Sequence, residues 1–333
     1  MISSDAKLNL LYSDILAALM DNDAKRFAAV CETAAQIARA YLVETEAAPV
    51  EITQQTKVIP FPTEMGLKGI GFAENEPFLI VAFPSDGKTL FCSNLVAHLI
   101  KDKYRVHVLH NEGNSQDYAI GAYRVLWSLL PPPSFRRLSK EDAFAEKEKV
   151  IQWLNRSSLK IINVRRDNPT ELIARITKIM AKDEADVILF DWLQNVSIKD
   201  DKHRFQGWSF IAQQLEELCL KWKKPVGVFG QMNRDGGREK LTIGAPSLGV
   251  IEGCPQMEQK SGVVLNLRNG TTNLDGWAGK PFFWINVAKN RHGARGQRNA
   301  RADFDSGSFV GQMDPDEYEN VIAHIKMQRK RTA

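Results

Sequence analysis

FLIVAFPSDGKT, residues 78–89, is the stretch that decides the fold of this chain. Its first residues are apolar and favour a β-strand, residues 84–87 favour a loop, and a helical pattern follows over residues 90–100. A strand, a loop ending in Gly-Lys-Thr and a helix form the arrangement of a P-loop. In such a loop, backbone N–H groups and the helix N-terminus bind nucleotide phosphates, the lysine neutralises their charge and the hydroxyl binds Mg²⁺.

The tripeptide Gly87-Lys88-Thr89 is not decisive by itself. Average residue usage gives Gly-Lys-Ser/Thr in roughly one chain of this length in six. The first position of the full pattern is also Ala82 instead of glycine. An ordinary surface turn is therefore the alternative, but the apolar run that precedes the loop favours a nucleotide site.

Composition sets bounds on the class of protein. The chain has 333 residues, 44% of them hydrophobic and 25% charged, as expected of a soluble globular protein. The net charge of +4 is too small to indicate nucleic-acid binding. Four scattered cysteines without metal-ligand spacing predict reduced thiols and a cytoplasmic location. Neither a signal peptide nor an apolar run long enough to cross a membrane is visible, so we expect no membrane partner.

Four regions follow one another along the chain. Residues 1–46 show apolar positions at helical spacing and predict a small all-helical segment of two helices. Residues 47–66 contain three prolines without a clear period and predict a linker. Short apolar strands alternate with helical segments over 67–313, and residues 314–333 predict a C-terminal helix with a basic tail. The two N-terminal helices need a partner for their apolar faces, either the main domain or a neighbouring subunit.

The third region predicts an α/β fold. Near-continuous apolar runs are typical of central strands in a parallel sheet that helices cover on both faces. Two later strands alternate more and predict antiparallel ribbons at the end of the sheet. Proline- and charge-rich residues 131–149 predict a surface excursion. The central strands are expected at residues 78–83, 105–110, 159–164, 187–190 and 226–230, and the later ones at 262–267 and 282–288.

Polar side chains follow several of these strands. Ligands bind beyond the carboxyl ends of parallel strands, so Asp191 could hold Mg²⁺ through water and Glu112 could orient a water for in-line attack. Gln231 could sense the γ-phosphate by hydrogen bonding. Lys289 and Arg291, two residues apart on an extended segment, point to the same side and suit a phosphate. Each has an alternative without a function in catalysis: the Asp only caps a turn, and the Glu only stabilises the start of a helix. The Gln lies in a loop without a role, and the two cations lie on a solvated hairpin edge.

In this order, the segments resemble the RecA-like C-terminal motor of DnaB-type hexameric replicative helicases over residues 66–312. The loop AFPSDGKT is similar to that family's A-x-P-S-x-G-K-T, in which Ala is common at the first position. HNEGNSQDYAIGAYRVL resembles the segment that begins S-L-E-M-S, and NVRRDNPTELIARITKIMAKDEADVILFDWLQNV resembles the block that ends I-V-I-D-Y-L-Q-L. GQMNR is similar to S-Q-L-N-R, and AKNRHGARG to G-K-x-R-N-G-x-x-G.

The resemblance implies a RecA-like P-loop NTPase that uses ATP and Mg²⁺. Glu112 would be the catalytic glutamate, Asp191 and Thr89 would hold Mg²⁺, and Gln231 would be the sensor. Lys289 and Arg291 would be cations supplied to a neighbouring subunit's nucleotide. The nucleotide would be bound by the loop residues Pro84, Ser85, Asp86, Gly87, Lys88, Thr89 and Leu90, with the extra acid Asp86 expected to point outward.

The region that corresponds to the family's DNA-binding loop departs from its pattern. The family reads S-D-L-R-E-S-G-x-I-E-Q-D-A-D, whereas residues 247–264 read SLGVIEGCPQMEQKSGVV. Glu252 occupies the position of the family's arginine, and its negative charge repels the DNA backbone. Pro255 occupies the position of the family's glycine and has no N–H to donate to a DNA phosphate. The candidate DNA contacts are Arg238, Lys240, Gln259 and Lys260.

The leading interpretation is an ATP-dependent, ring-forming DNA helicase that translocates on single-stranded DNA during replication. Its expected partners are single-stranded DNA or a forked duplex, further copies in a hexamer, and a loader or primase. The family's globular N-terminal domain is expected to be absent, and with it the primase-binding collar. The alternative is a RecA-like, ATP-switched assembly or recruitment protein without unwinding activity. The compact, divergent form resembles virus- or plasmid-encoded members, and a viral member would act in the host cytoplasm.

Overall fold

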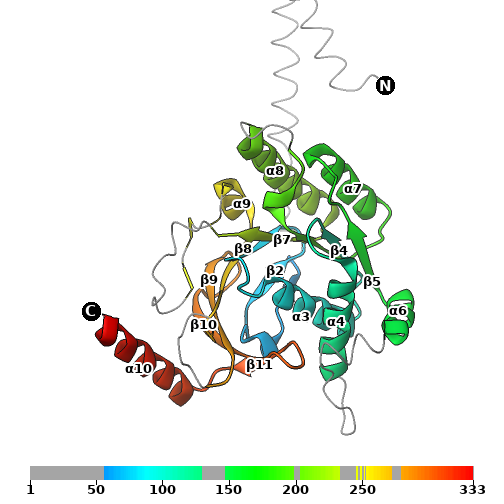
Figure 1. The fold of residues 1–333 in the computed structure, drawn as a ribbon. Coiled ribbons are helices and arrows are strands. Elements are labelled where there is room, and N and C mark those ends of the chain that lie inside the picture. Colours follow the sequence, from blue (N-terminus) through cyan, green and yellow to red (C-terminus); the bar gives the residue numbers. More distant parts are fainter. Residues whose placement is uncertain are drawn as a thin grey trace, which may run out of the picture. The chain divides into compact units, whose positions relative to one another are not determined.

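A computed structural model describes most of the unit that runs from Thr56 to Ala333 (Figure 1). The described residues are 56–129, 147–198, 203–232, 245–246, 248–249, 251, 253–271 and 279–332. The predicted helices of residues 1–46 lie outside this part, as do the first nine residues of the predicted linker. Arg238, Lys240 and Glu252 also lie outside the described residues.

Within the described residues, nine strands form one sheet in the order β11-β10-β9-β8-β3-β7-β6-β4-β5. The strands from β8 to β5 run parallel to one another, and β8 to β11 pair antiparallel. The parallel strands are β3 (Phe78–Ala82), β4 (Val106–His110), β5 (Leu159–Asn163), β6 (Val187–Asp191), β7 (Val226–Gln231) and β8 (Val263–Asn269). The antiparallel ones are β9 (Phe282–Asn290), β10 (Gly296–Asp303) and β11 (Ser308–Gln312).

The mostly parallel centre confirms the predicted fold class. Strands such as FLIVA in β3 and VILFD in β6 are buried along their whole length, which explains their continuous apolar sequences. The change to antiparallel pairing falls one strand later than predicted. β8 is parallel to β3 on one side and antiparallel to β9 on the other, so it belongs to the parallel centre as well as to the ribbon.

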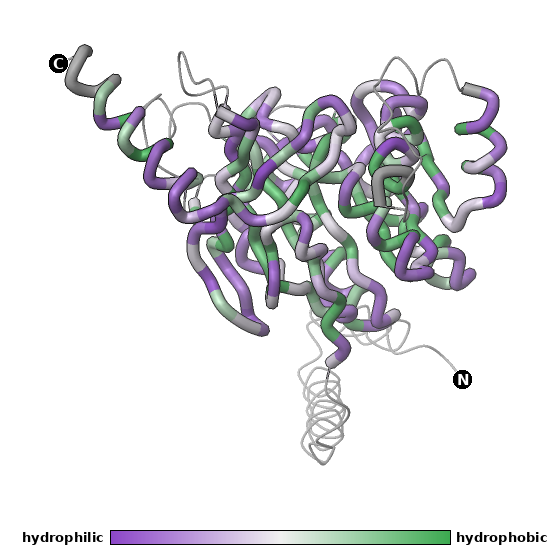
Figure 2. The backbone as a smooth tube through the Cα atoms, turned by 90° about the horizontal axis from the view of Figure 1, so that it is seen from below, coloured by the Kyte–Doolittle hydropathy of each residue, from purple (hydrophilic) through white to green (hydrophobic). Residues whose placement is uncertain are grey.

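Helices cover both faces of the sheet (Figure 1). Residues of α3 and α4 share one hydrophobic cluster with the strands, and residues of α7, α8 and α9 share the other. α10 reads mostly hydrophilic in Figure 2, with Val321 and Ile325 buried against Phe282 and Trp284 of β9. The helices are α3 (Lys88–Lys101), α4 (Ser115–Leu129), α6 (Lys147–Arg156), α7 (Pro169–Ala181), α8 (Arg204–Trp222), α9 (Pro255–Lys260) and α10 (Pro315–Thr332).

The second half of the predicted linker belongs to the folded unit. Strands β1 (Val58–Pro60) and β2 (Gly71–Ala73) pair antiparallel, with the 3₁₀ turn η1 (Thr63–Met65) between them. Ile59, Phe61 and Met65 are buried in the cluster beneath α3. Residues 56–66, predicted as the end of a linker, therefore belong to the folded unit. Two of the prolines that suggested a linker lie within it, Pro60 at the end of β1 and Pro62 in the connection to β2.

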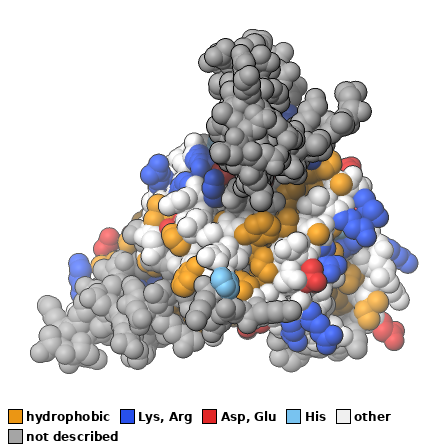
Figure 3. All heavy atoms as spheres, turned by 90° about the horizontal axis from the view of Figure 1, so that it is seen from above, with side chains coloured by type: hydrophobic (Ala, Val, Ile, Leu, Met, Phe, Trp, Pro, Cys, Tyr) orange, Lys and Arg blue, Asp and Glu red, His pale blue; other side chains and the backbone are white. Residues whose placement is uncertain are grey.

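The outer surface of α8 carries exposed apolar side chains. Phe205, Phe210 and Leu220 of this helix are all well exposed. Figure 3 shows hydrophobic side chains near the middle of the face seen from above, with Lys and Arg groups toward its margins. Scattered apolar groups of this kind are ordinary on a protein surface, so this face does not by itself mark a site.

Candidate active site

The phosphate loop connects β3 to α3, as its sequence predicts. Gly87 ends the loop with φ at 86°, a left-handed conformation that glycine adopts without strain. A Cβ added to Gly87 would lie 2.6 Å from the ring of Phe283 on β9. Glycine is therefore required at this position both by the backbone and by the close approach of β9.

A cavity of about 470 Å³ opens at the carboxyl ends of β3, β4, β6 and β7. Its volume lies in the range of small-molecule sites. The cavity brings together most of the residues that the sequence singles out, and it adds several that the sequence analysis missed. Lining residues that were predicted are Pro84, Ser85, Gly87, Lys88, Thr89, Glu112, Asp191 and Gln231; those that were missed include Asn114, Asp117, Tyr118 and Trp192.

Lys88 is the first residue of α3 and faces this cavity. Its Nζ lies 4.2 Å from the ring centroid of Trp192, a cation–π contact. Burial lowers the pKa of Lys88, and the carboxylates of Asp191 and Glu112 oppose that shift. The ammonium is thus held at the mouth of the phosphate loop between an aromatic face and two acidic groups.

Asp191 ends β6 with only 3% of its surface exposed. The hydroxyl of Tyr118 on α4 donates a hydrogen bond of 2.6 Å to its Oδ2. Burial raises the pKa of Asp191, while the Tyr118 hydrogen bond and Lys88 act in the opposite direction. A carboxylate that is buried this deeply favours a cation as an additional partner.

The oxygen donors in this cavity fit Mg²⁺ better than they fit a metal ion whose ligands all come from the protein. Among the described residues, no group of three or more His, Cys, Asp or Glu side chains could hold a metal ion. The Thr89 hydroxyl and the Asp191 carboxylate line the same cavity and supply hard oxygen donors. Mg²⁺ keeps several waters and takes its other ligands from nucleotide phosphates, so this sparse set suffices.

Glu112 lies just beyond β4 with an exposed side chain that lines the cavity. The buried His110 fixes its backbone, since the Nδ1 of His110 lies 3.0 Å from the carbonyl oxygen of Glu112. The Nε2 of the same ring lies 2.7 Å from the hydroxyl of Ser115 at the start of α4. The carboxylate is therefore free to turn into the cavity while its backbone is held.

Amide side chains join the three strand ends that carry Glu112, Asp191 and Gln231. The Asn111 side chain donates to the carbonyl of Trp192 and accepts from its N–H, both at 3.0 Å. The Gln194 side chain accepts from the Gln231 N–H at 3.0 Å and donates to the Gln231 carbonyl at 3.2 Å. Local sequence carries no signal for this frame, because each partner is more than thirty residues away along the chain.

Two predicted loop residues face away from the cavity. Asp86 is 8% exposed and turns into the protein toward β8. Burial raises the pKa of Asp86 to about 6, against the charge of Arg268 and a hydrogen bond with the Asn269 backbone. Leu90 packs against the hydrophobic cluster beneath α3. Neither side chain lines the cavity, and the outward orientation expected of Asp86 is instead an inward one. The prediction that the backbone of these two residues helps to bind the nucleotide stays a prediction.

Lys289 and Arg291 lie at the opposite edge of the sheet. Asn290 between them pairs with Val263 at the amino end of β8, whereas the phosphate loop follows the carboxyl end of β3. The Lys289 Nζ donates to the carbonyls of Glu258 and Gln259 at 2.8 and 2.7 Å. Within one chain these cations do not line the cavity.

Helix α9 contains the two candidate DNA contacts that the structure describes. Pro255 is its first residue, where a missing N–H costs nothing, which gives this proline a local structural reason. The Lys260 Nζ lies 2.5 Å from a carboxylate oxygen of Glu216 on α8, and Gln259 is exposed. Lys260 is thus already paired within the chain, and Arg238 and Lys240 lie outside the described part.

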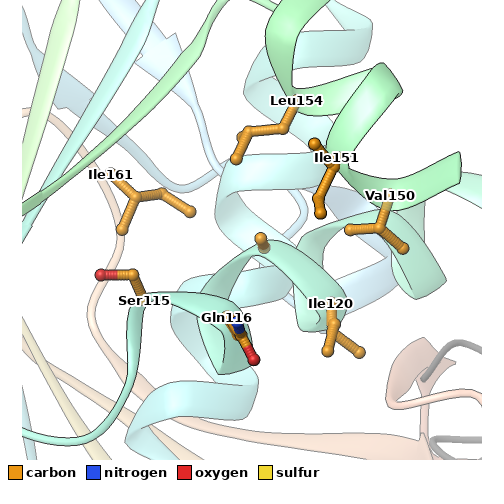
Figure 4. A pocket seen from close by; sticks show the side chains of 8 residues that line it. Ser115, Gln116, Ile120, Val150, Ile151, Leu154 and Ile161 are labelled. Atoms are coloured by element: carbon orange, nitrogen blue, oxygen red, sulfur yellow. The ribbon is translucent and has the colours of Figure 1, made fainter. Parts of the chain in front are cut away.

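A second pocket of about 150 Å³ lies between α4 and α6 (Figure 4). Figure 4 shows the side chains of Val150, Ile151 and Leu154 of α6 on the side that faces α4, and Ile120 of α4 also lines the pocket. Ile161 of β5 completes the apolar lining. Since its lining contains no charged side chain, this pocket is not suited to phosphate.

A mostly parallel sheet with a phosphate loop and acidic and amide groups at adjacent strand ends defines a RecA-like P-loop NTPase. Residues 63–309 match the DnaB-like helicase C terminal domain, and the chain belongs to this family. This confirms the resemblance drawn from the motifs.

Relatives and solved structures agree with the family. The chain is 24% identical over 245 residues to the replicative DNA helicase DnaC of Bacillus subtilis, covering 70% of this chain and 52% of that protein. It is 25% identical over 204 residues to a probable replicative DNA helicase of Trieres chinensis, covering 59% and 44%. The chain thus spans about half the length of the curated relatives it matches.

The fold is similar to that of a DnaB-like replicative helicase solved in a study of its interactions with primase. The TM-score is 0.62, with 18% identity over 92% of this chain and 76% of that one. A second solved structure, an isolated ATPase domain, also has a TM-score of 0.62, with 17% identity over 84% and 98%. In the described part of the chain, no helix is long and apolar enough to cross a membrane.

Proposed function

We propose that this chain is an ATP-driven motor that assembles into a hexameric ring, translocates on single-stranded DNA and unwinds duplex DNA during replication. The observation that carries the proposal is the shared cavity of Lys88, Glu112, Asp191 and Gln231. These residue types at adjacent strand ends suit hydrolysis of the β–γ phosphate bond. The replicative helicases among its relatives favour DNA as the substrate.

Each side chain has a distinct task in this reaction. The phosphate loop binds the nucleotide through its backbone N–H groups, and Lys88 neutralises phosphate charge. Glu112 orients the attacking water and accepts its proton. Thr89 and Asp191 would hold Mg²⁺, which would neutralise charge on the phosphate oxygens. Gln231 reports the state of the γ-phosphate through hydrogen bonds from a backbone that Gln194 fixes.

The position of the two cations supports assembly into a ring. Lys289 and Arg291 lie at the sheet edge away from the cavity, so each site takes these cations from the next subunit. A cyclic ring of head-to-tail contacts gives every subunit one such neighbour.

In this proposal the chain acts in the cytoplasm, or the host cytoplasm for a viral member, and engages a loader or primase. The helices predicted for residues 1–46 would serve assembly or these partners.

The test of the cations is Arg291→Ala in the full chain. We expect this variant to lose DNA-stimulated ATP hydrolysis while its affinity for nucleotide stays nearly unchanged, because the guanidinium acts on the neighbour's phosphate. Hydrolysis is followed by phosphate release and affinity by a fluorescent ATP analogue. Wild-type turnover in Arg291→Ala would rule out the trans-cation assignment.

A RecA-like assembly or recruitment protein that uses ATP as a switch remains the second candidate. Two observations favour it: Lys260 is paired with Glu216, and Pro255 removes an N–H from the loop that would hold DNA. Strand displacement on a forked duplex separates the two functions, with Lys88→Ala as the inactive control. Hydrolysis stimulated by single strands without any strand displacement would support the switch and overturn the motor.

A further inference from the structure

The turn between β2 and β3 places a carboxylate directly against the proposed trans cation. Glu76 Oε1 lies 2.8 Å from Nη1 of Arg291, and its Oε2 lies 2.8 Å from Nε2 of His292. Burial would raise the pKa of Glu76, but hydrogen bonds from Arg291 and His292 hold it below its ordinary value. The Glu76 side chain is 19% exposed and that of Arg291 is 40% exposed, so the pair is only partly screened by water.

Gly262 provides the space in which this carboxylate lies. A Cβ added to Gly262 would come within 1.8 Å of Glu76 Oε2. The Gly262 N–H donates to the carbonyl of Pro77 at 2.9 Å, and its carbonyl accepts from the Arg291 N–H at 3.0 Å. Backbone hydrogen bonds therefore fix the turn, the start of β8 and the end of β9 around the Glu76–Arg291 pair.

The remaining partners of the cations are neutral. Nη2 of Arg291 donates to the Gln259 carbonyl at 3.1 Å, and Lys289 binds carbonyls at the end of α9. A neighbour's phosphate must displace these contacts to take the guanidinium. Carbonyls release a cation more readily than a carboxylate does, since Glu76 carries a full charge that also repels phosphate.

We propose that Glu76 is a positioning residue that holds Arg291 within its own subunit and yields it only when a neighbour's nucleotide competes for the guanidinium. This inference rests on the proposed role of Arg291 at the neighbouring site. The contact makes hydrolysis more dependent on assembly, because each productive interface must first exchange the Glu76–Arg291 pair for an Arg291–phosphate pair.

The test is Glu76→Gln in the full chain, with single-stranded DNA and ATP present. Hydrolysis per subunit is measured across a range of protein concentrations. We expect the concentration that gives half-maximal turnover to fall about two- to fivefold, as the loss of one partly exposed ion pair allows. The rate at saturating protein and the affinity for nucleotide should stay as in the wild type. Glu74→Gln, on the same turn, is the matched control and should change neither quantity.

Gly262→Ala tests the same contact with every charge kept, because the added methyl group displaces the Glu76 carboxylate. It should lower the half-maximal protein concentration in the same direction, and it decides the matter if Glu76→Gln fails to fold in a thermal melt. Wild-type concentration dependence in the folded variants would overturn the inference. So would a lower rate at saturating protein in Glu76→Gln, since Glu76 would then support the active arrangement.

Arg291→Ala separates this inference from the proposed function. If that variant retains DNA-stimulated hydrolysis, the trans role of Arg291 is wrong and the inference falls with it. If Arg291→Ala is inactive while Glu76→Gln and Gly262→Ala match the wild type, the restraint by Glu76 alone is wrong.

Discussion

At the scale of single residues, the phosphate loop is fixed by contacts that its own sequence does not reveal. Gly87 contacts Phe283, and Asp86 faces Arg268, so β8 and β9 support the loop from the side away from the cavity. The motif predicted where the loop lies and that Lys88 and Thr89 face the cavity. It could not predict the orientation of Asp86, because strands almost two hundred residues later along the chain determine that orientation.

Gly87→Ala should therefore damage the loop by two separable effects. A left-handed backbone costs an alanine about 1 kcal/mol, and the clash with Phe283 adds about 1–3 kcal/mol. Gly69→Ala is the matched control, since Gly69 has φ at 76° and no atom within 4 Å of an added Cβ. Urea unfolding should show a larger loss of stability for Gly87→Ala than for Gly69→Ala. Equal losses would mean that β9 does not constrain the loop.

At the scale of elements, continuous apolar runs allowed the parallel strands to be predicted closely, whereas β10 and β11 were missed. β10 reads GQRNARAD and buries only Ala300 and Ala302, so its polar sequence hides its place in the sheet. The buried hairpin of β1 and β2 was missed because its prolines suggested a linker. In both cases the pairing partner, and not local sequence, determines the strand.

β4 also contains a buried histidine that should make stability depend on pH. Burial lowers the pKa of His107 to about 4, with Lys160 acting in the same direction. The unfolded chain, with an ordinary histidine pKa near 6.5, then binds more protons than the folded one between about pH 4 and pH 6.5. Stability is fully present above this window and is lost as the pH falls through it.

From pH 7.5 to pH 5, the His107 contribution to the free energy of unfolding should fall by about 2 kcal/mol. Chemical unfolding at the two pH values, compared between wild type and His107→Gln, measures this. The variant should lose that much less stability on acidification, whatever its stability at pH 7.5. His324→Gln on α10, away from the sheet centre, is the control. If His107→Gln loses as much stability on acidification as the wild type does, the pH dependence does not come from His107.

At the scale of the whole molecule, the sheet separates the two halves of one proposed catalytic site. Lys88 follows the carboxyl end of β3, whereas Arg291 lies beside the amino end of β8, which is parallel to β3. In the proposed ring, one subunit would present a nucleotide site at one end of these strands and the cations for the next subunit at the other. Motif order alone could not give this separation, since it follows from the antiparallel register of β9 on β8. Mixing two inactive variants tests the arrangement directly.

Lys88→Ala and Arg291→Ala should each be inactive alone, and an equimolar mixture should regain hydrolysis. An interface works when an Arg291→Ala subunit supplies the intact loop and a Lys88→Ala subunit supplies the intact guanidinium. Random assembly in a ring places this pair at no more than about one quarter of the interfaces. The control mixture replaces Lys88→Ala by the double variant, which supplies neither group and should regain nothing. If the first mixture also stays inactive while sedimentation shows mixed rings, then Lys88 and Arg291 do not act across a shared boundary. A head-to-tail ring would then not be needed to complete the catalytic site.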